Sequence, residues 1–191
     1  MQPILVAYGT TEGHTRKIAE FIAERLRIRG HRVDLVDTAT PAAQLLQPFY
    51  QGAILGGSVH YRKHQTGLVH FVRANLTWLS VIPTAFFSVS LAMAHPDDDD
   101  RIEAVRAANS FFDDTQWRPQ TVHHVAGALK YTSYDYFKRR LMKMLSAPLP
   151  PGAELPQDCE YTDWKAVEAF VDGYLADAGI AGGSRASPGG R

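Results

Sequence analysis

The sequence predicts an α/β protein built on a doubly wound parallel sheet, and three observations lead to this prediction. Apolar runs that suit buried strands alternate along the chain with runs of helical periodicity. The connections between these runs are short. Polar loops follow the first, third and fourth predicted strands, beginning at Thr10, Ser58 and Ser90. Such alternation places helices on both faces of a parallel sheet, and ligands of such sheets bind beyond the carboxyl ends of the strands.

Five strands are predicted from the apolar runs. Residues 3–8, 52–57 and 83–90 are mostly apolar, as buried strands are, whereas residues 32–36 alternate like a strand at an exposed edge. Residues 121–127 are the predicted fifth strand. Four helices are predicted where apolar residues recur at intervals of three and four. These helices include residues 18–26, 68–79, 102–112 and 164–175. Gly30 is the predicted stop of the first helix and Thr162 the predicted cap of the last.

The loop between the first strand and the first helix has the composition of a phosphate site. Two glycines allow close approach of the backbone, and threonine hydroxyls and the helix N-terminus supply donors. A P-loop would need Lys and then Ser or Thr after the second glycine, and the dinucleotide fingerprint would need a third glycine. The loop residues assigned to the site are Thr10, Thr11, Glu12, Gly13, His14 and Thr15.

The spacing of Thr10, Gly13 and Thr15 fits the flavodoxin pattern Ser/Thr-x-x-Gly-x-Thr. The absence of Lys and Arg from this loop suits the monophosphate of FMN held by neutral donors. The alternative is an ordinary Gly/Thr turn that caps a helix. Convergence of the loops after strands three and four favours the FMN site. Those loops contribute the candidate residues Ser58, Val59, His60, Tyr61, Ser88, Val89, Ser90, Leu91 and Ala92.

Composition narrows the classes of function. The 191 residues are 45% hydrophobic and carry 20 basic and 20 acidic residues, so the formal net charge is zero. A net charge of zero gives no support for nucleic-acid binding. The chain also lacks the excess of acidic residues that steers small electron carriers to basic partners. The single cysteine, Cys159, excludes a disulfide framework. With neither a signal peptide nor a spanning segment in view, we expect a cytoplasmic protein.

Two clusters invite a metal interpretation, and for both we expect none. Residues 97–100 are four aspartates ahead of a predicted helix, where carboxylates favour the helix dipole. His123 and His124 are adjacent on a predicted strand and therefore point to opposite faces. We expect these histidines to be packed or hydrogen-bonded.

The segment of about residues 128–158 is predicted to be a long insertion near the fifth strand, with residues 159–161 as a late fragment of that strand. Within it, residues 134–145 form a basic amphipathic pattern, which favours a membrane surface or a partner, or else a helix packed on the sheet. The candidate docking residues are Phe137, Lys138, Arg139, Arg140, Leu141 and Lys143. We expect residues 1–178 to form one domain and residues 179–191 a flexible glycine-rich tail.

Beyond these patterns, the chain resembles the menaquinone-dependent protoporphyrinogen oxidase family. The matching pieces are residues 10–15, 56–61 (Gly-Gly-Ser-Val-His-Tyr), 86–91 (Phe-Phe-Ser-Val-Ser-Leu), 116–119 (Gln-Trp-Arg-Pro), 126–131 (Ala-Gly-Ala-Leu-Lys-Tyr) and 161–164 (Tyr-Thr-Asp-Trp). The pieces at 116–119 and 126–131 discriminate from plain flavodoxins. Glu12 stands where family members carry Asp, and residues 146–156 are unusually proline-rich.

The resemblance implies a flavodoxin-like fold with strand order 2-1-3-4-5, and FMN-dependent oxidation of protoporphyrinogen IX to protoporphyrin IX with a quinone as acceptor. It implies that His60 and Tyr61 flank the flavin ring, and no separate catalytic residue is needed because the flavin supplies the chemistry. Candidate contacts to the substrate are Arg62, Lys63, Lys130 and Tyr131. A bilayer quinone implies docking at an anionic membrane surface, peripheral to the cytoplasmic face of the inner membrane. Homo-oligomerisation stays open, and the alternatives are a flavodoxin electron carrier and an NAD(P)H:quinone reductase.

Overall fold

The five-stranded parallel sheet has the strand order β2-β1-β3-β4-β5 in the computed structural model, as predicted. The structure describes residues 2–94, 98–129 and 159–181. The strands are β1 (Ile4–Gly9), β2 (Val33–Asp37), β3 (Gly52–Ser58), β4 (Thr84–Ser90) and β5 (Thr121–Ala126). The residues of β1 and β4 are buried throughout, which explains their continuous apolar runs, while β2 lies at an edge.

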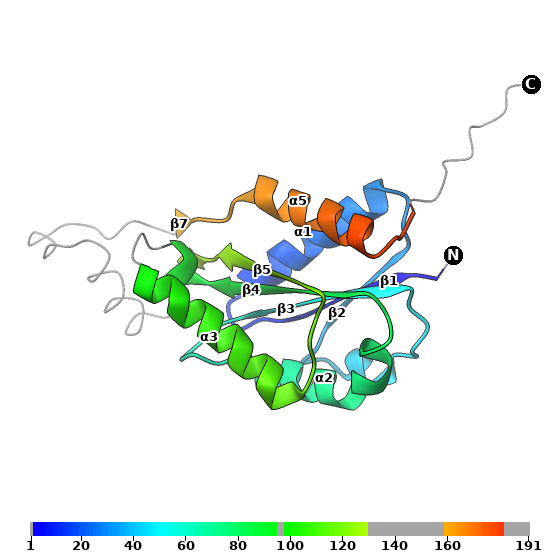
Figure 1. The fold of residues 1–191 in the computed structure, drawn as a ribbon, viewed down its shortest axis with the longest axis horizontal. Coiled ribbons are helices and arrows are strands. Elements are labelled where there is room, and N and C mark those ends of the chain that lie inside the picture. The colour runs from blue at the N-terminus through cyan, green and yellow to red at the C-terminus, as the bar shows by residue number, and fades with distance from the viewer. Residues whose placement is uncertain (1, 95–97, 130–158, 182–191) are drawn as a thin grey trace, which may run out of the picture.

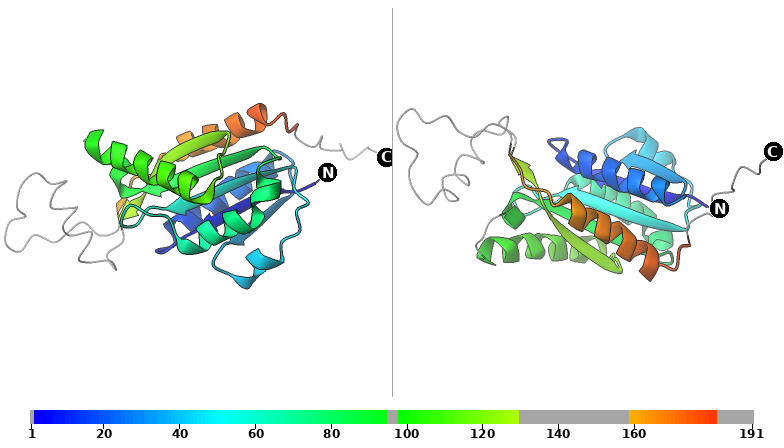
Figure 2. Two further views of the ribbon diagram at one scale, coloured as in Figure 1. Left: turned by 60° about the horizontal axis from the view of Figure 1, so that its bottom comes forward. Right: turned by 90° about the horizontal axis from the view of Figure 1, so that it is seen from above.

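Helices cover both faces of the sheet (Figures 1 and 2). The α-helices are α1 (His14–Ile28), α2 (Thr66–Leu79), α3 (Asp98–Thr115) and α5 (Trp164–Asp177), and short 3-10 helices are η1 (Pro41–Leu45) and η2 (Leu91–Ala94). One core cluster joins the sheet to α1 and α5, with Ile22 and Val171 fully buried. The other joins it to α2 and α3 through Phe86, Phe111 and Trp117. The sheet is therefore the middle layer of three, and ligands of such sheets bind beyond its carboxyl ends.

The two helices over the first face end in the same way. Gly30, with φ 86°, donates from its N–H to Arg27 O, and His31 N donates to Leu26 O. This is the Schellman arrangement, which needs a residue at positive φ and so explains the predicted glycine stop. At the end of α5, Gly179 (φ 63°) and the next residue repeat the arrangement. The helix stop therefore includes the first residues of the segment predicted to be a tail.

The prediction for the start of α5 was wrong by one residue. Asp163 caps this helix, because its carboxylate accepts from Lys165 N at 3.0 Å and Ala166 N at 3.1 Å. Thr162 instead donates its hydroxyl proton to Ala126 O at 2.8 Å, across to the end of β5. Its hydroxyl ties α5 to the sheet and is not free to cap the helix.

The predicted insertion begins and ends beside β5, but it does not interrupt that strand. β5 is unbroken in the sheet, and the chain continues into β6 (Ala128–Leu129). β7 (Cys159–Glu160) pairs with β6 antiparallel, so the two form a separate two-stranded sheet. The expectation that residues 159–161 belong to the fifth strand is thus corrected. Residues 130–158 lie outside the described part of the chain.

The histidines and aspartates considered as metal ligands take part in packing and in the start of a helix. His123 stacks on Phe170 of α5, with ring centroids 5.2 Å apart, while the adjacent His124 lies on the other face. Asp98 begins α3, so carboxylates occupy its first turn as expected for a helix N-terminus. Among the residues that the structure describes, no group of His, Cys, Asp and Glu is placed to hold a metal ion.

A tight contact in the middle of the sheet gives the first prediction. A Cβ added at Gly56 would lie 2.0 Å from Cζ of Phe87, which is fully buried. We expect Gly56→Ala to lower the free energy of unfolding by about 1–3 kcal/mol, because the ring has to be displaced within a packed core. Urea denaturation measures the effect. Gly173→Ala in α5 is the control: nothing lies within 4 Å of its added Cβ, so we expect stabilisation of about 0.5–1 kcal/mol. Equal effects in the two variants would contradict the packing argument.

Candidate functional site

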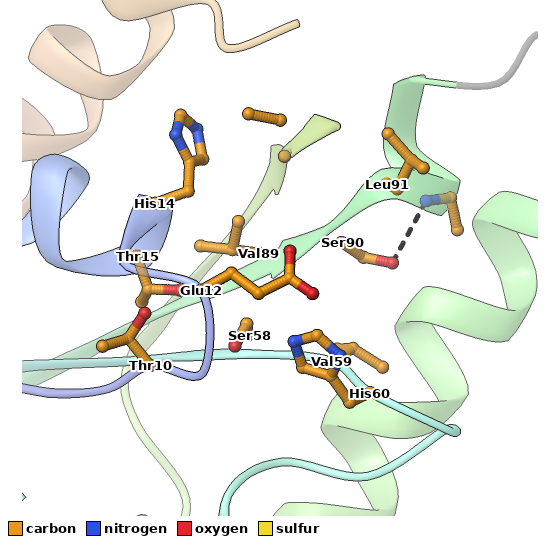
Figure 3. A pocket seen from close by; sticks show the side chains of 13 residues that line it. Thr10, Glu12, His14, Thr15, Ser58, Val59, His60, Val89, Ser90 and Leu91 are labelled. Carbon is orange, nitrogen blue, oxygen red and sulfur yellow. Dashed lines mark hydrogen bonds between the residues drawn. The ribbon is translucent and has the colours of Figure 1, made fainter. Parts of the chain in front are cut away.

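A pocket lies at the carboxyl ends of β1, β3 and β4, where the sequence predicts the site (Figure 3). It contains about 510 Å³ of space, part of which opens to solvent. Its lining comprises Thr10, Glu12, His14, Thr15, Ser58, Val59, His60, Val89, Ser90, Leu91, Ala92, Gly127 and Ala128. Four predicted site residues do not line it, namely Thr11, Gly13, Tyr61 and Ser88. Gly127 and Ala128 were not predicted; they belong to the chain just after β5.

The first loop turns into α1 through a glycine. Gly13 has φ 86° and is the N-terminal cap residue of the helix, with no side chain capping the first turn. Thr10 Oγ1 accepts from Gly13 N at 2.9 Å, which leaves the Thr10 hydroxyl proton to be donated elsewhere. The N–H groups of the first turn and the positive end of the helix dipole therefore face this end of the pocket.

Thr15 provides the clearest test of whether an anion fits this pocket. Its side chain is 1% exposed, and its Oγ1 has no hydrogen-bond partner among the described residues. A buried hydroxyl without a partner is unfavourable unless a ligand satisfies it. The residue lines the pocket beside the N-terminus of α1. A phosphate oxygen is the acceptor that this arrangement lacks, so the residues present fit the phosphate of a flavin mononucleotide.

His14 connects the pocket to the segment that precedes α5. Its Nε2 lies 2.8 Å from Thr162 Oγ1. Because Thr162 donates its only hydroxyl proton to Ala126 O, this oxygen accepts from His14. The network therefore assigns the proton of neutral His14 to Nε2. The predicted phosphate loop is thus held by residues from the far end of the chain.

Gln65, which sequence reasoning missed, joins two of the converging loops. Its Nε2 donates to Thr11 Oγ1 at 3.1 Å and also to Ser58 Oγ. Thr11 is exposed and does not line the pocket. Its bond to Gln65 therefore supports the first loop from outside the pocket. Gln65 can approach this closely because Gly9 has no Cβ. A Cβ added at Gly9 would lie only 3.0 Å from Gln65 Oε1. The sequence feature that could have identified Gln65 is its position directly before α2.

His64 anchors the same loop in the core. Its Nε2 lies 3.5 Å from Oγ of Ser88, which is fully buried beneath the pocket. Its ring packs edge-on against Phe86 and Phe111, with centroids 5.3 and 5.1 Å away. Burial lowers the pKa of His64 from 6.5 to about 4, because the charged form would lose its hydration. The imidazole is therefore neutral at physiological pH.

The loop after β4 completes the wall. Ser90 Oγ accepts from Ala92 N at 3.2 Å, the dashed line in Figure 3. This bond holds η2 against the end of β4. Tyr61 lies at the tip of the neighbouring loop and is 74% exposed, outside the pocket.

Several predicted residues lie outside the described part of the chain. These are Lys130 and Tyr131, proposed for substrate, and Phe137, Lys138, Arg139, Arg140, Leu141 and Lys143, proposed for membrane docking. Within the described ranges, no helix is both long enough and apolar enough to cross a bilayer.

The unpartnered hydroxyl of Thr15 gives a prediction for the protein without ligand. We expect Thr15→Val to leave the free energy of unfolding unchanged or to raise it slightly, because a buried polar group without a partner is removed. The control is Thr38→Val: Thr38 Oγ1 donates to Tyr8 O at 3.1 Å, so its loss should cost about 1 kcal/mol. Chemical denaturation of both variants after removal of bound ligand checks this. A loss at Thr15 as large as that at Thr38 would show a bond that the structure lacks.

The buried His64 gives a pH prediction. Its folded-state pKa of about 4 lies below the ordinary 6.5, so the unfolded chain binds more protons between these values. The contribution of His64 to the free energy of unfolding is therefore fully present above pH 6.5 and is lost as the pH falls toward 4. The loss is on the order of 3 kcal/mol.

Comparing His64→Leu with the parent isolates this effect. We expect the variant to lose less stability than the parent between pH 7 and pH 4.5, measured by urea denaturation at each pH. His70→Leu, on the exposed face of α2, should keep the parental pH dependence. Identical pH profiles for His64→Leu and the parent would contradict the assignment.

Comparison with known proteins agrees with the geometry. Residues 5–149 match the flavodoxin domain family. The protoporphyrinogen IX dehydrogenase [quinone] of Leishmania major is 32% identical over 173 residues, covering 90% of this chain and 74% of that protein. The Escherichia coli K12 protein of the same name is 28% identical over 168 residues, covering 87% of this chain and 91% of its own.

Solved structures show the same fold. Oxidised flavodoxin 1 from Bacillus cereus matches with a TM-score of 0.56 at 15% identity, covering 91% of this chain and 97% of the flavodoxin. This likeness concerns the fold alone. The sequence matches go further, because they run through nearly the whole chain: it belongs to the flavodoxin domain family and, within it, to the family of the quinone-linked protoporphyrinogen IX dehydrogenases.

Proposed function

We propose that this protein is an FMN-dependent protoporphyrinogen IX dehydrogenase that passes electrons to a quinone in haem biosynthesis. The observation that carries the proposal is the match over 90% of the chain to the Leishmania major protein of that name. The pocket supports it, because it combines a helix N-terminus with an unpartnered buried hydroxyl where a phosphate is expected.

In this proposal the residues of the chain bind and orient, and the flavin supplies the redox chemistry by accepting a hydride equivalent from the substrate. Thr10, Thr15 and the first N–H groups of α1 would hold the phosphate. The loops at Ser58 and Ser90 would border the flavin ring, and His60 offers an imidazole nitrogen on the wall of the pocket. Overall, six electrons and six protons leave protoporphyrinogen IX, and three quinones become three quinols.

The acceptor determines where the protein works. A menaquinone or ubiquinone resides in the bilayer, so we propose that the protein approaches the cytoplasmic face of the inner membrane from the surface. The basic segment at residues 134–145 is the proposed contact, on the strength of its sequence pattern.

The FMN assignment predicts a specific loss of affinity. We expect Thr10→Ala combined with Thr15→Ala to weaken FMN binding more than a hundredfold, since a hydrogen bond to a charged group contributes roughly 1.5–3 kcal/mol. Quenching of flavin fluorescence on titration measures the dissociation constant. Thr77→Ala, on the exposed surface of α2, is the matched control and should leave it unchanged. Unaltered affinity in the double variant would place the phosphate elsewhere.

The activity is tested without oxygen. We expect porphyrin fluorescence to appear when FMN-loaded protein is mixed with protoporphyrinogen IX and a menaquinone analogue, and to require both FMN and quinone. Rapid reduction of the flavin by NADPH, with no reduction by protoporphyrinogen, would replace this proposal with an NAD(P)H:quinone reductase. Flavin reduction by neither compound would favour an electron carrier.

A further inference from the structure

A second hollow adjoins the flavin pocket, between the turn at residues 60–63 and α3. It contains about 1180 Å³ of space, counted out to its open side. Arg62 and Lys63 line one wall, and Asp99, Ile102, Glu103 and Arg106 of α3 line the other. His60 of the same turn lines the flavin pocket, so the turn separates the two spaces. A molecule in this groove would lie next to whatever occupies the pocket.

The turn itself has a conformation that its residues do not favour. His60 N donates to Lys63 O and Lys63 N donates to His60 O, each at 2.9 Å. The two residues between them, Tyr61 and Arg62, have φ values of 48° and 64°. Two central residues at positive φ are the pattern of a type I′ turn, which strongly prefers Asn-Gly. Non-glycine residues held in this region store strain, and such strain concentrates at ligand sites.

The strained turn projects a cation over the groove. The side chain of Arg62 is 76% exposed, and its Nε donates to Glu103 Oε1 of α3 at 3.0 Å. Lys63 and Arg106 add two further cations, and neither forms an ion pair with another residue in the described part of the chain. Beside these charges, Ile102 is an apolar side chain that is 44% exposed. The groove thus offers three basic groups and two carboxylates, Asp99 and Glu103, beside an apolar side chain.

We infer that this groove binds the carboxylates of the substrate, with Arg62 as the main contact and Glu103 occupying its guanidinium when no substrate is bound. The inference rests on the proposed function and deepens it. A guanidinium pairs with a carboxylate in a planar fork, and Lys63 and Arg106 offer charge to a second carboxylate. Ile102 contacts the apolar macrocycle. Glu103 competes with the substrate for Arg62 and so weakens binding.

Replacing Arg62 separates binding from stability. Glycine adopts positive φ without strain, so we expect Arg62→Gly to unfold at a higher denaturant concentration than the parent. The same variant should raise the KM for protoporphyrinogen, and the dissociation constant for protoporphyrin IX, by about tenfold or more, because a charged hydrogen bond is lost. Arg62→Asn, which tolerates positive φ, repeats the loss of affinity with less change in the turn.

Glu103→Gln tests the competition and should lower both constants, because it frees the guanidinium. Asp114→Asn is the matched control, since Asp114 is an exposed carboxylate on the same helix that does not line the groove. Protoporphyrin IX dimethyl ester tests the ligand chemistry. It lacks the two carboxylates, so the parent and Arg62→Gly should bind it equally.

The outcomes distinguish the groove from the proposed reaction. If the parent oxidises protoporphyrinogen while Arg62→Gly, Arg62→Asn and Glu103→Gln leave KM and porphyrin affinity unchanged, the groove inference is overturned and the reaction stands. If the parent binds the porphyrin through Arg62 but does not oxidise protoporphyrinogen, the groove stands and the reaction falls. An equal loss with the dimethyl ester would also overturn the carboxylate assignment.

Discussion

The site depends on the register of the parallel sheet. Backbone pairing aligns Gly9 of β1 with Gly57 of β3, and Gly57 with Ser88 of β4. Because the strands are parallel and in register, the loops that follow them begin along one line. Every residue proposed for the cofactor lies within a few positions of this row or of its continuation at the end of β5. Fixing the hydrogen-bond ladder therefore also fixes which loops can touch one ligand.

The two glycines of this row have a second role. Added Cβ atoms at Gly9 and Gly57 would both meet α2 and the residues just before it, at 3.0 Å from Gln65 Oε1 and 2.7 Å from Leu68 Cδ2 respectively. Their absence lets the start of α2 lie directly against the ends of β1 and β3. Gln65 then bridges two loops, and His64 enters the core below them. Close packing of the start of α2 on the sheet thus places the side chains of Gln65 and His64 where they support the pocket.

Three buried polar atoms without hydrogen-bond partners in the described part of the chain lie at or beside the pocket. Thr15 Oγ1, His64 Nδ1 and Gln65 Oε1 are buried without hydrogen-bond partners among the described residues. Each such group lowers stability relative to a satisfied one. Deeper in the same core, Phe86, Phe111 and Trp117 pack ring against ring. Trp117 Nε1 and both ring nitrogens of His31 also lack partners among the described residues, so such atoms are not confined to the pocket.

The strands, the helices and the converging loops were predictable because apolar periodicity and loop composition are local properties. The phosphate loop was predictable as well, since Gly13 and Thr15 lie four and six residues after the last residue of β1. What escaped prediction depended on contacts between distant segments. Thr162 resembled a helix cap in sequence, but its hydroxyl is used by Ala126 O, 36 residues earlier. Gln65 gains its role from packing that spacing does not encode.

The paired strands β6 and β7 give the predicted insertion a narrow base. The chain leaves at Leu129 and returns at Cys159, and these two residues are partners across the pair. Glu160 then accepts from Lys17 of α1 at 2.6 Å, which fastens the returning chain. Since the entropy of closing a loop grows only logarithmically with its length, the segment beyond this base can lengthen or shorten at small cost to the fold. The same base therefore offers a place for grafting a foreign domain next to the flavin pocket.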